Sequence, residues 1–156
     1  MQAIGQLLRK VKWGRLDYLL IDMPPGTGDV QLSIIQNIPV SGSLIVTTPQ
    51  HIATQDANKS IAMYRSVKCE IFGIVQNMAG YRCSNCRTIN HLFGKNGAQQ
   101  LADQHGLSVL GNVPIDESIQ LACDQGRPLD SKELNDCFDA ICLNLIKQLK
   151  QPLVPS

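Results

Sequence analysis

Aromatic residues are scarce in this 156-residue chain, at 4% of the sequence, and neither sign of charge is in excess. The length predicts one domain, so aliphatic side chains must fill its core. The 14 Lys and Arg residues nearly balance the 13 Asp and Glu residues, which argues against nucleic acid or an anionic membrane as a partner. No apolar run approaches the ~20 residues of a membrane span, and residues 1–5 do not resemble a signal peptide. We therefore expect a cytoplasmic location with reduced thiols.

Short apolar runs alternate with segments of helical spacing along the chain. The runs predict buried strands over residues 16–23, 43–47, 71–77 and 108–113. Helical spacing covers residues 4–11, 29–37, 54–67, 97–105 and 134–149. Because the runs are nearly continuous instead of alternating with polar residues, both faces of the sheet should be covered, which favours parallel strands. The pattern predicts an α/β fold with a mostly parallel sheet flanked by helices.

The last predicted helix carries the clearest apolar stripe. Cys137 and Cys142 fall on that stripe, so we expect both thiols in the core. Asp130 or Ser131 can cap the start of this helix.

The run Ile21–Asp29, IDMPPGTGD, is the first segment that suggests chemistry. Asp22 would end a buried strand at the sheet edge where α/β proteins bind ligands, and there its carboxylate can hold Mg²⁺. The glycine-rich exit exposes backbone N–H groups that can bind a terminal phosphate. An aspartate at a strand end is common, so this signal depends on the residues that follow it.

Cys83 and Cys86 form the second such segment. Two intervening residues let both sulfurs bind one metal ion. The polar surroundings predict an exposed loop, in which Arg82 and Arg87 should favour the thiolate form. His91 follows closely and could ligate a metal, but a surface or capping role is the simpler interpretation.

One cysteine pair supplies two of the four ligands that a metal site usually needs. Three interpretations remain open on spacing alone. The pair could be a redox dithiol, it could recruit Cys69 or Cys123, or it could meet the same pair of a second subunit across a two-fold axis.

The motifs together resemble the Mrp type of iron–sulfur cluster carrier ATPases, a deviant group of P-loop NTPases. The resemblance rests on five stretches in order: IDMPPGTGD at 21–29, TTPQ at 47–50, GIVQNM at 73–78, CSNC at 83–86 and LGNVP at 110–114. It extends from about residue 16 to residue 129. It implies one partial MinD- and Mrp-like P-loop domain over residues 1–150, with the cysteine loop near 81–87, and a frayed tail at 151–156.

The resemblance implies a nucleotide site for ATP and Mg²⁺. Asp22 would belong to the Mg²⁺ shell on the catalytic side, and Asn77 would hydrogen-bond adenine, although a loop cap is the alternative for Asn77. Pro114 and Asp116 would lie beside the base. Three residues of the glycine-rich exit would follow the γ-phosphate: Gly26, Thr27 and Gly28.

The resemblance also implies the role of the cysteine pair. Cys83 and Cys86 would bind a [4Fe–4S] cluster between the subunits of a homodimer, for transfer to apo iron–sulfur client proteins. ATP binding and hydrolysis would control that transfer in the full-length form. The alternatives are a positioning ATPase of the MinD and ParA type, or a thiol redox protein that uses the same pair.

The sequence contains no glycine-rich phosphate loop of the GKGGVGKS type with which such proteins begin their nucleotide site. Its single Gly-Lys pair, Gly94-Lys95, has Ile89 where the first glycine is required. We therefore expect no tight ATP binding or hydrolysis by this chain alone. We interpret it as a fragment of a longer carrier, in preference to a split half or a degenerate form, and expect the sheet to present an unpaired apolar edge.

Overall fold

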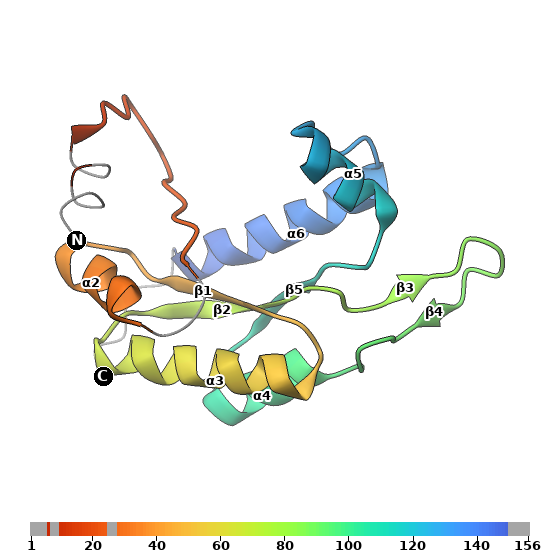
Figure 1. The fold of residues 1–156 in the computed structure, drawn as a ribbon, viewed down its shortest axis with the longest axis horizontal. Helices are drawn as coiled ribbons and strands as arrows, with labels where there is room; N and C mark the ends of the chain where they lie inside the picture. Colours follow the sequence, from red (N-terminus) through yellow and green to blue (C-terminus); the bar gives the residue numbers. More distant parts are fainter. Residues whose placement is uncertain (1–5, 7–9, 25–27, 150–156) are drawn as a thin grey trace.

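The computed structural model describes residues 6, 10–24 and 28–149. Within these residues, three parallel strands form the central sheet in the order β1-β2-β5, where β1 is Ser43–Thr47, β2 is Ile71–Gln76 and β5 is Val109–Asn112. A small antiparallel hairpin, β3 (Tyr81–Arg82) with β4 (Ile89–Asn90), projects beyond this sheet (Figure 1). None of the helices in the described part of the chain is long and apolar enough to cross a bilayer.

Helices cover both faces of the sheet. The described helices are α2 (Asp29–Asn37), α3 (His51–Ser66), α4 (Gly97–His105), α5 (Glu117–Gln125) and α6 (Lys132–Leu149). Figure 1 shows α3 and α4 on one side of the strands and α6 on the other. The predicted α/β class, the parallel pairing and the strand over 43–47 are therefore confirmed. The hairpin and α5 were not predicted.

In the described part of the chain, an apolar cluster lies on each face of the sheet. Ile74 of β2 is fully buried in the cluster that α3 and α4 cover, where Ile61 is its largest fully buried neighbour. The next residue, Val75, packs on the opposite face against Ile141 of α6. Successive strand side chains point to opposite faces, so a strand covered on both sides must be apolar at consecutive positions, as β2 is.

The predicted strand over 16–23 is wrong. These residues form no strand, and Leu20 is 86% exposed. A strand requires a neighbour for its backbone N–H and C=O groups, and within the described residues β1 pairs with β2 alone. Among the described residues, β1 therefore forms the unpaired edge that the sequence predicted. Its Val46 is 60% exposed. Most of the predicted helix at 4–11, and the tail at 151–156, lie outside the described residues.

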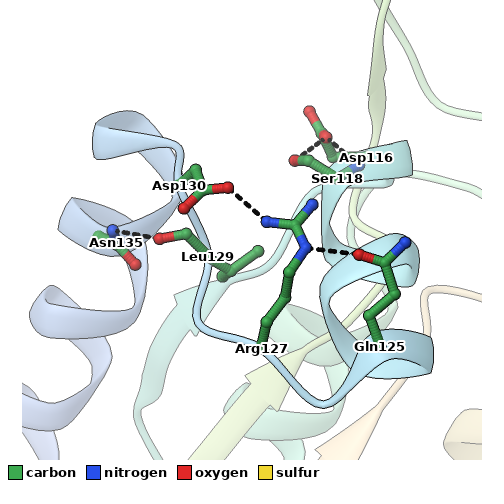
Figure 2. Close-up of polar contacts among 7 residues, drawn as sticks. All are labelled: Asp116, Ser118, Gln125, Arg127, Leu129, Asp130 and Asn135. Atoms are coloured by element: carbon green, nitrogen blue, oxygen red, sulfur yellow. Dashed lines mark hydrogen bonds and ion pairs between the residues drawn. The ribbon is translucent and has the colours of Figure 1, made fainter.

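Figure 2 shows how the connection between α5 and α6 is fixed. Arg127 donates from Nε to Gln125 Oε1 at 2.6 Å and forms an ion pair with Asp130. Ser131, not Asp130, caps α6, because its Oγ accepts from the backbone N–H of Leu134 at 3.4 Å. Asn135 completes the corner by donating to the carbonyl of Leu129 at 3.0 Å.

The two cysteines of α6 differ in position. Cys137 is half-buried and packs against the cluster around Val75. Cys142 is exposed, so its expected core position is wrong. Each helical residue advances by about 100°, so Cys142, next to the buried Ile141, falls at the solvent edge of the stripe.

His105, the last residue of α4, is held by side chains of α3. Arg65 donates from Nη1 to His105 Nδ1 at 3.2 Å and from Nη2 to the His105 carbonyl at 2.6 Å. With Nδ1 accepting, Nε2 carries the proton and donates to Asn58 Oδ1 at 2.6 Å. Burial, followed by the charge of Arg65, lowers the pKa of His105 below its ordinary value.

We expect His105 to make the stability of the protein depend on pH. Because its pKa is lower in the folded chain than in the unfolded chain, its contribution is complete above the unfolded value of about 6.5 and is lost as the pH falls below it. Urea unfolding at pH values on either side of that value would show a smaller acid loss for His105→Gln than for the wild type. Equal losses in the two proteins would contradict the prediction.

Candidate functional site

The carboxyl ends of β1, β2 and β5 meet at one edge of the sheet, where Gln76 joins three elements. Gln76 is 4% exposed, and its Oε1 accepts from the backbone N–H of Ala98 in the first turn of α4 at 3.0 Å. Its Nε2 donates to Asn112 Oδ1 of β5 at 3.2 Å and to the Lys95 carbonyl at 3.3 Å. Sequence reasoning missed this residue; the only signal was a glutamine at the end of an apolar run.

Asn77, the predicted adenine contact, follows Gln76 at this edge. Its backbone N–H donates to the Thr47 carbonyl at 2.8 Å, which joins the ends of β1 and β2. Its Oδ1 accepts from the backbone N–H of Met78 at 2.8 Å, and Met78 has the left-handed φ of 54°. The side-chain oxygen of Asn77 therefore acts as a loop cap, which was the alternative role. The amide Nδ2 makes no hydrogen bond with the described residues, which leaves a donor for a ligand.

The segment after β5 is bonded to the chain that leads to the hairpin. Ala79 N–H donates to the Val113 carbonyl at 3.0 Å, and Ile115 N–H donates to the Gly80 carbonyl at 2.8 Å. Asp116 caps α5, since its Oδ1 accepts from the backbone N–H of Ser118 at 2.9 Å (Figure 2). The residues predicted to lie beside a base, Pro114 and Asp116, thus adjoin the support of the cysteine hairpin.

Residues 83–88 form the turn of the hairpin. Cys83 N–H donates to the Thr88 carbonyl at 3.0 Å, and Arg87 N–H donates to the Cys83 carbonyl at 2.8 Å. Arg87 adopts the left-handed φ of 58°, which closes the turn. Both cysteines are free thiols; Cys86 is exposed and Cys83 is half-buried. The predicted exposed position is confirmed, although a two-residue ladder supports what was expected to be a loop.

The two sulfurs have different surroundings. Cys86 Sγ lies 3.3 Å from Thr88 Oγ1, and this hydroxyl, followed by the Thr88 backbone and Cys83, lowers the pKa of Cys86. The predicted contribution of the flanking arginines is wrong, since neither Arg82 nor Arg87 is among the causes of the lowered pKa of Cys86. Arg82 instead pairs with Glu133 of α6 at 3.1 Å. Burial, by contrast, raises the pKa values of Cys69 and Cys137. The thiolate, the form that binds metals, is therefore favoured at Cys86.

Within the described residues, no group of three or more His, Cys, Asp or Glu side chains could hold a metal ion. His91 Nδ1 lies 2.9 Å from the Ala79 carbonyl, which agrees with the capping role. Cys69 lies before β2 and the cysteine hairpin lies after it. The six residues of β2 extend over about 20 Å, so Cys69 and the hairpin lie at opposite ends of this strand. Neither Cys69 nor Cys123 joins the pair in a group of three possible ligands among the described residues, so completion of the site within one chain has no support there.

The phosphate side of the predicted nucleotide site is not assembled around Asp22. Asp22 is exposed in the irregular segment and does not end a strand. Gly26 and Thr27 lie outside the described residues. Gly28 is the N-cap of α2 and Asp29 is its first residue. Asp22 and Gly28, the described residues predicted to contact Mg²⁺ and phosphate, are therefore not placed to bind them. Asn77 and Pro114, predicted to contact the base, do lie together at the carboxyl edge of the sheet.

A model of the ParA family, described as the NUBPL iron-transfer P-loop NTPase, matches residues 1–150. The chain belongs to this family. The mouse iron–sulfur cluster transfer protein NUBPL is 54% identical over 129 residues, which cover 83% of this chain and 40% of the mouse protein. The chain thus spans about half, or less, of the length of the relatives it matches.

Solved structures agree with this family. The nucleotide-binding protein of Archaeoglobus fulgidus, in complex with ADP, is 40% identical with a TM-score of 0.73; the match covers 82% of this chain and 53% of that one. The cell division ATPase MinD of Pyrococcus furiosus, with a TM-score of 0.65, matches 94% of this chain and 56% of its own at 22% identity. The MinD likeness shows the P-loop NTPase fold alone and gives no support to a positioning function.

Proposed function

We propose that this chain is the cluster-holding part of an iron–sulfur cluster carrier. Two chains hold one [4Fe–4S] cluster as cargo through Cys83 and Cys86 of each, and pass it to apo iron–sulfur proteins. The observation that carries this proposal is the hairpin turn, which presents two free cysteines together, one of them exposed with a lowered pKa.

The count of ligands favours a second copy of the chain. Such a cluster takes four cysteine thiolates, and the described residues offer one pair with no third ligand nearby. A two-fold axis beside the hairpin supplies the other pair. Large apolar side chains flank the turn and would be covered by the copy: Tyr81 at 39% exposed, Ile89 at 52%, Leu92 at 64% and Phe93 at 37%.

We assign the use of ATP and Mg²⁺ to the longer form of the protein. The relative from Archaeoglobus was solved with ADP, and Asn77 and Pro114 here share the sheet edge at which α/β proteins bind ligands. Two backbone hydrogen bonds, Ala79 to Val113 and Ile115 to Gly80, join that edge to the hairpin. Movement of the base-side segment would therefore reach the cysteines through a short, bonded path.

Anaerobic incubation of the chain with ferrous iron and sulfide tests the proposal. We expect the absorption of iron bound by thiolates, four iron atoms for every two chains, and a particle of twice the 17.1 kDa of one chain. A colourless chain would contradict the cluster function. An iron-free disulfide between Cys83 and Cys86 would favour the redox alternative, to which the lowered pKa of Cys86 also points.

A further inference from the structure

Thr88 contacts both cysteines of the hairpin turn. Its backbone carbonyl accepts from Cys83 N–H at 3.0 Å, and its Oγ1 lies 3.3 Å from Cys86 Sγ. Thr88 ends the turn directly before β4, whose Ile89 pairs with Arg82 of β3. A residue outside the Cys-x-x-Cys motif thus fixes the backbone of one cysteine and the sulfur of the other.

The contact with Cys86 changes direction when the sulfur binds a metal. In the thiol form, the S–H of Cys86 donates to the Thr88 hydroxyl. Once the sulfur has lost its proton it can only accept, and the same separation lets the hydroxyl donate to it. Among the described residues no side-chain hydroxyl reaches Cys83 in this way, so the two ligands of one chain are unequal.

We propose that Thr88 is a positioning residue of the cluster site, whose hydroxyl donates a hydrogen bond to the Cys86 sulfur and tunes the bound cluster. The inference rests on the proposed function, since it concerns the same cargo. Partners of this kind orient a metal ligand, and their loss costs metal affinity. A hydrogen bond to a ligand sulfur also stabilises the more negative, reduced cluster, and so raises its reduction potential.

The test compares Thr88→Val, which is close in shape but has no hydroxyl, with Thr88→Ser, which keeps it. Ser84→Ala is the matched control, because Ser84 lies in the same turn and its hydroxyl makes no hydrogen bond with the described residues. The backbone carbonyl that holds Cys83 remains in every variant, so the turn itself should persist. Co²⁺ titration of the metal-free proteins gives the affinity of the site, and redox titration of the reconstituted proteins gives the potential of the cluster.

We expect Thr88→Val to bind Co²⁺ about 10-fold more weakly than the wild type and its cluster to have a more negative potential. Thr88→Ser and Ser84→Ala should resemble the wild type in both measurements. If Thr88→Val matches the wild type, or if Thr88→Ser is impaired to the same degree, the proposed role of the hydroxyl is overturned while the cluster function stands. A wild type that takes up neither Co²⁺ nor a cluster would overturn the cluster function, and the role of Thr88 with it.

Discussion

A chain with serine at both Cys83 and Cys86 should assemble no cluster and should remain a monomer after incubation with iron and sulfide. Serine keeps the shape of cysteine but supplies no thiolate, the ligand that iron–sulfur clusters require. Each single substitution removes two of four ligands from a two-fold site, so each should also abolish a stable cluster. Iron and sulfide content, visible absorption and molecular mass measured on one sample would establish the result.

The matched control replaces two cysteines that are exposed but lie outside the hairpin, Cys123 and Cys142. Cys123→Ser/Cys142→Ser should load and dimerise like the wild type. Loss of the cluster in this control, or its survival in the hairpin variant, would mean that iron binds elsewhere in the chain. The same result would also remove the reason for a second copy, because the argument for the dimer depends on the two ligands that each hairpin supplies.

The sequence predicted the parts of the fold in which local pattern and tertiary contact agree. Strand β2 is apolar at consecutive positions because Ile74 and Val75 face two different clusters. A consecutive apolar run of this kind can be recognised in the sequence. The run at 16–23 has the same pattern but no described neighbour, and a strand depends on its neighbour as much as on its own residues. Pattern alone therefore could not separate the two cases.

Some residues of the candidate site could be predicted from the sequence and others could not. Cys83 and Cys86 could be found because their spacing is itself the chemical requirement. Gln76 and Thr88 could not, since their importance comes from what they contact: Ala98 and Asn112 for the former, Cys86 for the latter. Hydrogen bonds that join separate elements leave no periodic signal in a single sequence. The cause of the lowered pKa of Cys86 was misassigned to arginine for the same reason.

Replacing Gly97 with alanine should destabilise the protein by about 3 kcal/mol, at the upper end of what overpacking costs. A Cβ atom at Gly97 would lie against the Pro49 carbonyl oxygen, 2.8 Å from its carbonyl carbon and 2.9 Å from its Cα. These are backbone atoms of a buried residue that links β1 to α3, so they cannot rotate away as a side chain could. The first turn of α4 is equally fixed, because Gln76 accepts from Ala98 N–H at 3.0 Å.

Urea unfolding followed by circular dichroism would measure this loss, and a thermal scan should show a midpoint lower by roughly 10 °C. Gly28→Ala is the control, since no described atom lies within 4 Å of its Cβ position and its φ of −82° suits any residue. As the N-cap of a helix it should lose less than about 1 kcal/mol. If both variants lose the same free energy of unfolding, the contact with Pro49 is not the reason that position 97 requires glycine, and backbone flexibility is. A larger loss at Gly97 would establish that the connection from β1 to α3, at Pro49, lies too close to the start of α4 for a Cβ atom at this position. The start of α4 is thereby held at the sheet edge, where Gln76 accepts from Ala98 N–H.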